Sequence, residues 1–159
     1  AEASFNTALM RIVIQRVSEA AVKIEGNIVG EIQKGLLVLL GIEHEDGQDD
    51  AKYLIQKLIQ LRIFSDADGK MNLSVQDVNG GILVVSQFTL HAATKKGNRP
   101  SYIRAARPEQ AIPLYEYFVA ELQNQFSGKI QTGQFGADMK VSLVNDGPVT
   151  IIIDSKGEI

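Results

Sequence analysis

The sequence predicts a single mixed α/β domain in which two main helices cover one side of mixed β-sheets. Three observations support this fold class. Apolar and β-branched runs recur at both ends and in the middle of the chain, two segments between them have helical spacing, and no linker or low-complexity stretch divides them. The order of strands, helix, strands, helix and strands is typical of a layered α/β domain, and 159 residues suffice for one such core.

The predicted strands differ in their patterning. Apolar and polar residues alternate from Met10, and turn chemistry at Gly26 predicts a hairpin. The unbroken apolar runs "GLLVLLGIE", residues 35–43, and "ILVVSQFTL", residues 82–90, each predict a buried strand, the first of them central in the sheet. The end of the chain predicts two or three more strands, with Gly147-Pro148 as the turn between the last pair.

Two segments have the spacing of amphipathic helices. Residues 49–64 begin with acids, which the helix dipole favours, and residues 108–126 begin with a proline that suits a first helical turn. The predicted apolar faces contain Ala51, Leu54, Ile55, Leu58 and Leu61 in the first helix and Ala111, Leu114, Tyr115, Phe118 and Leu122 in the second. The acidic stretch at 65–70 predicts a turn, because it lacks the remaining ligands of a calcium loop.

Composition excludes several classes of protein. The chain has no cysteine, which excludes disulfides, thiol nucleophiles and zinc–thiolate sites and fits the reducing cytoplasm, where we expect the protein. No apolar run approaches the roughly 20 residues of a membrane span. Residues 1–9 lack the basic start and apolar centre of a secretory signal, so we interpret them as an added leader before a natural start at Met10. Residues 10–159 are expected to form the single domain.

The stretch "VVSQFTLHA" raises the question of a nucleophile. Strand alternation sends Ser86 and Phe88 to one face and Gln87 and Thr89 to the other. The chain must therefore bend, or the site lies at the end of the strand. Ser86 lacks the G-x-S-x-G elbow of a hydrolase serine, so a structural serine is favoured over a catalytic triad.

Neither histidine predicts a metal or triad site. His44 and His91 fit no metal-ligand spacing, and there is no cysteine to complete a site. The glycines match neither the phosphate-binding P-loop nor the dinucleotide fingerprint. We therefore predict an activity that needs no metal and no cofactor.

The clearest electrostatic feature is a basic segment from His91 to Arg107. It contains no acid, and it holds five of the chain's sixteen Lys and Arg residues, namely Lys95, Lys96, Arg99, Arg104 and Arg107. With its interleaved Tyr102, this segment fits a phosphate-backbone partner and a solvated loop about equally well. The net charge of −3 does not decide between them, because a binding face is a local property.

The stretch "NDGPVT" also allows two interpretations. It fits an ordinary turn, in which Gly147 adopts unusual dihedral angles and Pro148 fixes the next one. A tight turn can alternatively hold the X-Pro bond in the cis form, which would aim the two carbonyl groups rigidly in one direction. A backbone held in that way can exclude a substrate group by its shape.

Two motifs together resemble the D-aminoacyl-tRNA deacylase family, which includes D-tyrosyl-tRNA deacylases. They are "SQFTL" at Ser86–Leu90 and "NDGPVT" at Asn145–Thr150. The segments "QRV", "GNRPSY", "LYEYF" and "TGQFGADMKVSLVNDGPVT" are also similar to family sequence. The likeness covers nearly all of Met10 to Asp154. Either motif alone is weak, whereas both in order are highly specific.

The resemblance implies a three-layer α/β/β fold and a homodimeric, cytosolic editing enzyme. Such an enzyme hydrolyses the ester that joins a D-amino acid to the 3′ end of tRNA, and glycine mischarged on tRNA-Ala is a further expected substrate. The two motifs would meet across the dimer interface. A cis Gly147-Pro148 unit would enter the partner's pocket and reject L-amino acids.

The resemblance also implies roles for individual residues. The pocket wall would contain Ser86, Gln87, Phe88 and Thr89, and the backbone N–H groups of Phe88 and Thr89 would act as oxyanion donors. Thr89 is the natural protein candidate for a nucleophile. The family's chemistry is nevertheless assigned largely to the 2′-hydroxyl of the terminal ribose, so a chemical role for Thr89 stays open.

Further residues are implied around this pocket. Arg16 would hold the orientation of the Gly-Pro carbonyls, with support from Asn145, Val149 and Thr150. The terminal adenosine would bind near Phe135, Gly136, Ala137 and Met139, although Phe135 and Met139 fit a core position equally well. The acceptor stem would contact Lys95, Lys96 and Arg99.

Two alternatives from other classes stay open. The first is a non-catalytic tRNA- or RNA-binding module that uses the basic segment; its binding would be salt-sensitive and indifferent to the 3′ ester. The second is a serine esterase that acts on small molecules through Ser86.

Overall fold

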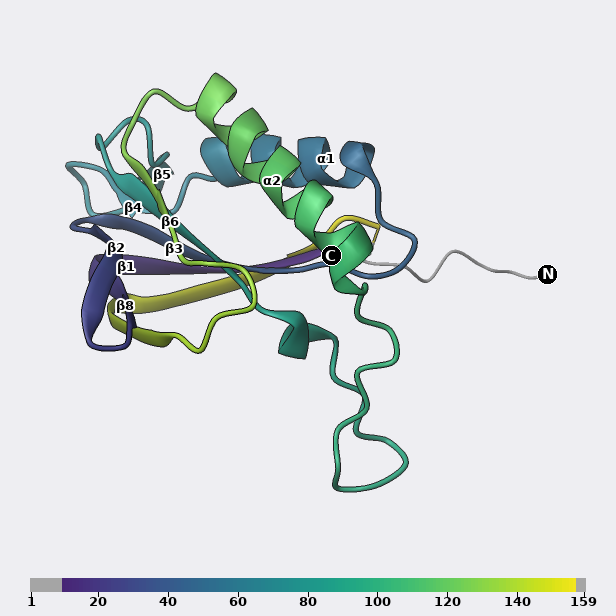
Figure 1. Ribbon diagram of the computed structural model, residues 1–159. Coiled ribbons are helices and arrows are strands. Elements are labelled where there is room, and N and C mark those ends of the chain that lie inside the picture. The colour runs from purple at the N-terminus through teal and green to yellow at the C-terminus, as the bar shows by residue number, and fades with distance from the viewer. Residues whose placement is uncertain (1–9, 157–159) are drawn as a thin grey trace.

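The structure contains one large curved sheet, a small hairpin and two α-helices (Figure 1). The computed structural model describes residues 10–156, so the leader expected at residues 1–9 lies outside the described residues. The sheet strands are β1 (Arg11–Ile24), β2 (Asn27–Ile32), β3 (Gly35–Gly41), β6 (Gly81–Ser86), β7 (Ile130–Thr132) and β8 (Lys140–Asp154). The other elements are β4 (Phe64–Ser65), β5 (Met71–Leu73), α1 (Gln48–Gln60), α2 (Pro108–Gln125) and the short 3-10 helix η1 (Phe88–His91). The predicted fold class, a mixed α/β domain, is confirmed.

The long strand β1 organises the sheet, because it changes its partner along its length. Residues 11–17 pair with β3, residues 20–24 pair with β2, and β8 runs antiparallel along the opposite edge of both halves. The sheet therefore curls, in the order β2-β1-β3-β6-β7, until it is nearly closed. Where β2 approaches β7, a Cβ atom on Gly30 would lie 2.6 Å from the carbonyl oxygen of Thr132, so only glycine fits there.

The hairpin expected at Gly26 is present between β1 and β2. Glu25 and Gly26 both have positive φ angles, of 49° and 82°, as the tight turns of β-hairpins require. The central strand expected at residues 35–43 is also confirmed, because β3 lies between β1 and β6 and pairs in parallel with β6. Its apolar residues have no solvent-facing side, which explains the continuous hydrophobic run.

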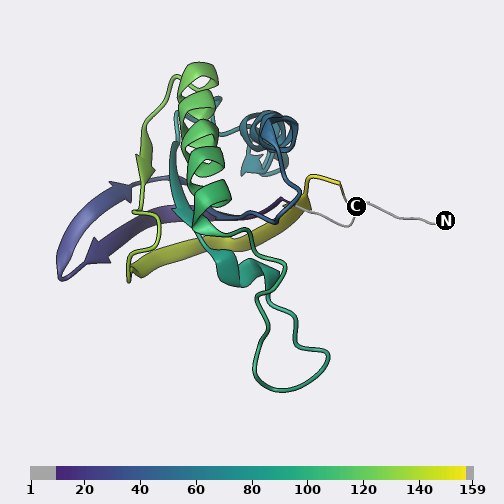
Figure 2. The ribbon, with the colours of Figure 1, turned by 45° about the vertical axis from the view of Figure 1, so that its right-hand side comes forward.

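Both α-helices cover the same face of the sheet (Figures 1 and 2). The main core between helices and sheet includes Ile12, Ile14, Leu36, Val38, Ile82, Val84, Leu54, Leu58, Phe118 and Leu122. Helix α2 begins at Pro108 as expected. No helix within residues 10–156 is long and apolar enough to cross a membrane.

Helix α1 is shorter than the segment 49–64 suggested. It ends at Gln60, and Leu61 is extended, with a ψ angle of 126°. The reason is a competing tertiary pairing, in which Phe64 pairs with Leu73 in the β4–β5 hairpin and Arg62 donates to the Asn72 carbonyl. The turn predicted after Phe64 is therefore the tip of this hairpin.

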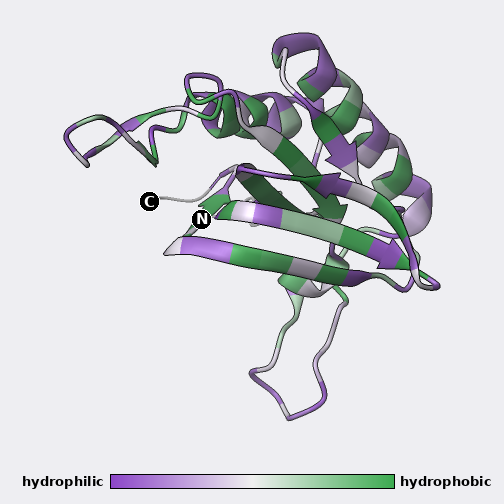
Figure 3. Ribbon diagram, turned by 90° about the vertical axis from the view of Figure 1, so that its left-hand side faces the viewer, coloured by the Kyte–Doolittle hydropathy of each residue, from purple (hydrophilic) through white to green (hydrophobic). Residues whose placement is uncertain are grey.

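A second, smaller core lies on the other face of the curled sheet. It contains Val17, Ala20, Val22, Ile32, Leu37, Leu83 and Val85, against which Leu39, Met139, Val141 and Leu143 pack. Other strands, which have one face towards solvent, carry hydrophobic residues interleaved with hydrophilic ones (Figure 3). The strands β3 and β6 contribute side chains to both cores, so packing on both faces of the sheet fixes their position.

The course of β8 differs from the expectation of a turn at Gly147-Pro148. Gly147-Pro148 does not reverse the chain between two strands, because β8 continues on both sides of it and stays antiparallel to β1. Val17 pairs with Asn145 and Gln15 pairs with Thr150, so residues 146–149 form a bulge opposite Arg16. The peptide bond between Gly147 and Pro148 is cis.

Candidate active site

A cavity of about 420 Å³ opens at the end of strand β6. It is lined by Val85, Ser86, Gln87, Phe88, Thr89, Phe135, Gly136, Ala137, Asp138, Met139 and Val141. Two segments that are far apart in sequence therefore line the same cavity. All eight residues that sequence reasoning assigned to the pocket wall and the adenosine region line this cavity. Val85, Asp138 and Val141 were missed, and their only signal is that they are next to these segments in the sequence.

The "SQFTL" segment enters the cavity because the strand ends at Ser86. Gln87 is still extended, and its N–H donates to the Leu40 carbonyl at 2.8 Å. The chain then turns into η1, so Phe88 and Thr89 no longer alternate across a sheet. The bend that the alternation argument required is thus present, and the buried strand predicted over residues 82–90 ends four residues early.

The 3-10 helix exposes hydrogen-bonding groups to the cavity. Gln87 Nε2 donates to Thr89 Oγ1 at 2.9 Å, which fixes the threonine side chain. The N–H groups of Phe88 and Thr89 stand at the start of η1, where a helical turn supplies no acceptor. Among residues 10–156, neither Ser86 nor Thr89 is hydrogen-bonded to a carboxylate or an imidazole. The site therefore lacks the base that a protein nucleophile requires.

The opposite wall is held by packing around Phe135. Its ring lies 5.7 Å from the ring of Tyr115 on α2, measured between centroids. Gly136 has a φ angle of 79°, and the Ala137 N–H donates to the Gln134 carbonyl at 3.2 Å, so the chain makes a tight turn here. Met139 packs against Gly133 and against the second core. The core interpretation of Phe135 and Met139 is compatible with their place in the cavity wall.

Behind η1 lies a buried ionic cluster that sequence reasoning missed. His91 Nδ1 and Arg104 Nη2 each lie 3.0 Å from Glu43 Oε2. Arg11 Nη1 donates to the Leu90 carbonyl at 3.1 Å and pairs with Asp154. The available signal in the sequence was the acid that ends the apolar run "GLLVLLGIE". In the folded protein this acid lies close to the segment that contains no acids.

The basic segment forms a loop that projects from the body of the protein (Figures 1 and 2). Reciprocal backbone hydrogen bonds of 2.8 Å between Ala93 and Ser101 close its neck. Lys95, Lys96 and Arg99 are exposed beyond this neck, and none of them lines the cavity. The loop begins after η1, part of which lines the cavity.

The Gly-Pro bulge lies elsewhere on the chain. Arg16 donates to the Asp146 carbonyl at 3.0 Å and to the Ile63 carbonyl at 2.7 Å. Asn145 accepts from the Val149 N–H and donates to the Thr150 hydroxyl. Both strand ends of the bulge are thereby fixed. No residue from 145 to 150 lines the cavity of its own chain.

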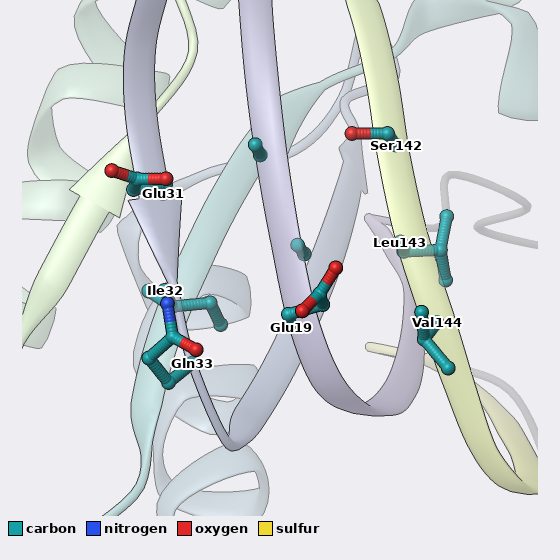
Figure 4. A pocket seen from close by; sticks show the side chains of 9 residues that line it. Glu19, Glu31, Ile32, Gln33, Ser142, Leu143 and Val144 are labelled. Atoms are coloured by element: carbon teal, nitrogen blue, oxygen red, sulfur yellow. The ribbon is translucent and has the colours of Figure 1, made fainter.

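A second depression, of about 200 Å³, is lined by residues of β1, β2 and β8 and the adjoining Gln33 (Figure 4). The lining residues are Glu19, Ala20, Ala21, Glu31, Ile32, Gln33, Ser142, Leu143 and Val144. Two carboxylates and no cation make it unsuited to a ligand that carries phosphates. The cavity at the end of β6 is therefore the candidate active site.

Known proteins are similar to this chain over nearly all of the described domain. The family described as D-Tyr-tRNA(Tyr) deacylase matches residues 13–154. The chain belongs to this family. The D-aminoacyl-tRNA deacylase of Flavobacterium psychrophilum is 64% identical over 149 residues, which cover 94% of this chain and 99% of the relative. The enzyme of the same name from Flavobacterium johnsoniae is 65% identical over 147 residues, with 92% and 98% coverage.

Two solved structures are similar to this chain over nearly all of its length. A protein described as c-Myc DNA Unwinding Element Binding Protein has a TM-score of 0.86 and 42% identity, and the match covers 91% of this chain and 97% of that chain. A probable eukaryotic D-amino acid tRNA deacylase has a TM-score of 0.78 and 15% identity, with 92% and 99% coverage. The latter likeness shows the fold, and the family expected from the two motifs is confirmed.

Proposed function

We propose that the protein is a D-aminoacyl-tRNA deacylase, an enzyme that hydrolyses the ester between a D-amino acid and the 3′ end of tRNA. The observation that carries this proposal is the cavity, because the "SQFTL" segment and residues 135–139 line it together. The acid-free loop begins at the same 3-10 helix. A polyanion whose end occupies the cavity would therefore meet cations directly outside it. The proposed reaction belongs to the cytoplasm and requires no cofactor.

The chemistry in this proposal depends largely on the substrate. The terminal 2′-hydroxyl lies next to the ester and assists the addition of water to the carbonyl carbon; the bond to the ribose oxygen then breaks, which releases the free D-amino acid and tRNA. The N–H groups of Phe88 and Thr89 would stabilise the oxyanion, a contribution of about 3–4 kcal/mol per donor. Gln87 and Thr89 would orient the ester, and Ser86 would complete the wall. A reaction that relies on the 2′-hydroxyl and on backbone N–H groups needs no general base next to Thr89.

Rejection of L-amino acids is proposed to come from Gly147 and Pro148 of the partner subunit in a homodimer. Three observations support this: Gly147 and Pro148 are exposed, Arg16 and Asn145 fix the bulge on both sides, and the bulge lines no part of its own chain's cavity. An additional methylene gives an apolar pocket only about 1–3 kcal/mol, so attraction to varied D side chains would discriminate poorly. A rigid wall excludes the L side chain, and it admits glycine, including glycine mischarged on tRNA-Ala.

The tRNA itself would bind along the route from the cavity to the loop. We assign the terminal adenosine to Phe135, Gly136, Ala137 and Met139, which form the wall opposite η1. Lys95, Lys96 and Arg99 would contact phosphates of the acceptor stem, since all three are exposed beyond the neck of the loop.

The direct test compares D-tyrosyl-tRNA and L-tyrosyl-tRNA as substrates. We expect rapid release of D-tyrosine and little release of L-tyrosine. Equal hydrolysis of both, or of neither, would contradict the proposal. Salt-sensitive binding of tRNA without hydrolysis would instead favour the non-catalytic RNA-binding module, and labelling of Ser86 by a fluorophosphonate would favour a serine esterase.

A further inference from the structure

An exposed pair of aromatic rings connects the cavity with the basic loop. The ring centroids of Phe88 and Tyr102 lie 4.9 Å apart, and the ring planes meet at 77°. Phe88 is 56% exposed and Tyr102 is 37% exposed. The two exposed rings touch each other, so they form a contiguous apolar surface of the kind that ligands and partners contact. We call this pair the aromatic ledge.

The edge-to-face geometry leaves room for a flat ligand. In such a pair, one ring presents its edge to a face of the other ring. The first ring therefore keeps both of its faces, and the second ring keeps its far face. A planar group can stack on the ledge without separating the two rings.

The ledge is held in place before any ligand arrives. Phe88 belongs to η1, which is fixed by the hydrogen bond from Arg11 to the Leu90 carbonyl. Tyr102 directly follows Ser101, whose two backbone bonds to Ala93 close the neck of the loop. The Tyr102 carbonyl also accepts from the Ala105 N–H at 3.0 Å, so the chain turns immediately after the ring.

The buried cluster anchors the same part of the loop. Glu43 pairs with Ala105 as an isolated β-bridge and with Arg104 through an ion pair of 3.0 Å. Its carboxylate also lies 3.0 Å from His91, at the other arm of the loop. One buried acid therefore fixes both arms of the loop that carries Tyr102. A ring that is held in place in this way loses little conformational entropy when a ligand binds.

The surroundings of the ledge select the chemical class of its ligand. Phe88 lines the cavity on one side, and Lys95, Lys96 and Arg99 lie beyond the neck on the other. The loop between them contains no acid. Stacking surfaces beside a cationic path are the combination that binds single-stranded nucleic acid, with aromatic faces for the bases and cations for the phosphates.

We propose that the aromatic ledge stacks on the base of the cytidine that precedes the terminal adenosine of tRNA. This assignment rests on the proposed function, which puts the terminal adenosine in the cavity. The next base would then leave the cavity past Phe88, which lines it and contacts Tyr102, and the phosphate would be directed towards the loop. The ledge would thus align the 3′ end and distinguish a tRNA end from a free aminoacyl nucleoside.

The test uses two small substrates that differ by one nucleotide. They are 3′-O-D-tyrosyl-adenosine and the corresponding ester of cytidylyl-(3′→5′)-adenosine. Tyr102→Ala should lower kcat/KM for the dinucleotide ester and for D-tyrosyl-tRNA about tenfold, within the range for one base stacked on an aromatic side chain. The same variant should leave kcat/KM for the adenosine ester unchanged. Tyr102→Phe should behave as wild type, because it retains the ring.

Two further variants separate stacking from structure. Tyr102→Leu retains apolar bulk but has no ring face, so it should match Tyr102→Ala. Ile103→Ala alters the neighbouring side chain, which is 77% exposed, and should change neither substrate. An equal loss on both small substrates, or no loss on either, would overturn the proposal. A shift to monomers in sedimentation with Tyr102→Ala would also overturn it, since the ledge would then contact another copy of the chain.

Binding measurements keep this test independent of catalysis. Calorimetry with cytidylyl-(3′→5′)-adenosine and with AMP should show that Tyr102→Ala weakens only the dinucleotide. If the wild type hydrolyses no ester, the proposed function fails while this comparison still decides about the ledge. Equal affinities of wild type and Tyr102→Ala for the dinucleotide would overturn the stacking proposal even in an active enzyme.

Discussion

His91 Nδ1 lies 3.0 Å from Glu43 Oε2, and the two side chains are only 2% and 4% exposed. Burial is the main cause that lowers the pKa of His91 below its ordinary value. The Gly41 backbone and Glu43 oppose this shift, whereas the charges of Arg11 and Arg104 add to it. The imidazole is therefore neutral at neutral pH.

This pair predicts a pH dependence of stability. Below about pH 6.5, the ordinary pKa of histidine, the unfolded chain binds a proton at His91 while the folded chain does so only at lower pH. The free energy of unfolding should therefore fall as the pH decreases through this range. Urea unfolding of wild type and His91→Gln between pH 5 and pH 8 measures the effect. The stability advantage of the wild type should shrink towards acidic pH, and a constant difference would contradict the prediction.

Asp46 supplies a control, because its pKa shift should change stability with pH in the opposite direction to that of His91. Burial raises its pKa from 3.8 to about 6, although its Oδ2 accepts from the Glu43 N–H at 2.6 Å. Between these two values the folded chain binds the proton more tightly than the unfolded chain, so stability falls as the pH rises through them. Asp46→Asn removes this titration. The free energy of unfolding of the wild type relative to Asp46→Asn should therefore decrease from pH 4 to pH 7. Over the same range, the free energy of unfolding of the wild type relative to His91→Gln should increase.

Thr89→Ala should keep much of the deacylase activity. Thr89 accepts a hydrogen bond from Gln87 and has no hydrogen-bonded base among the described residues, so loss of its hydroxyl removes orientation and not a nucleophile. Single-turnover hydrolysis of D-tyrosyl-tRNA measures the rate. A tRNA that ends in 2′-deoxyadenosine should bind to the wild type but react barely at all. The reverse pattern would restore a protein nucleophile.

Gly147→Ala should impair chiral rejection. Gly147 has a φ angle of 128°, and an added Cβ would lie 2.8 Å from Arg16 Nη2 and 2.9 Å from Val149 Cγ2. We expect a loss of about 1–3 kcal/mol in the free energy of unfolding, because both backbone and contacts are strained. We also expect the ratio of L-tyrosyl-tRNA to D-tyrosyl-tRNA hydrolysis to rise. Gly69→Ala is the matched control: its φ angle is 79° with no neighbour within 4 Å of the added Cβ, and it should lose stability without losing selectivity.

Lys95→Glu together with Lys96→Glu should weaken the action on tRNA. Each lost phosphate contact should reduce the salt dependence of tRNA binding by about one unit of slope. Hydrolysis of 3′-O-D-tyrosyl-adenosine should not change, because neither lysine lines the cavity. Titration of tRNA binding across salt concentrations measures the slope. Lys52→Glu, an exposed lysine on α1, is the control, and an equal effect there would point to net charge alone.

Local sequence patterns predicted most elements of the fold. Alternation from Met10, the turn at Gly26 and the apolar run from Gly35 lead to strands because side-chain direction follows a fixed period along the backbone. Pro108 begins a helix for a similarly local reason. The predictions failed where a distant partner intervened. Helix α1 stops before Leu61 because the β4–β5 hairpin holds the following segment extended.

The two motifs were enough to predict the family, and the absence of acids between His91 and Arg107 was visible without a structure. The sequence by itself also determined that Ser86, Gln87, Phe88 and Thr89 could not share a pocket on a regular strand. Only the tertiary structure decided how residues 135–139 meet η1 in one cavity and how the Gly-Pro segment bulges within β8. It alone brought Glu43 to His91 and Arg104. The physical reason is that periodicity determines which way a side chain points, whereas the pairing of distant strands determines what it meets.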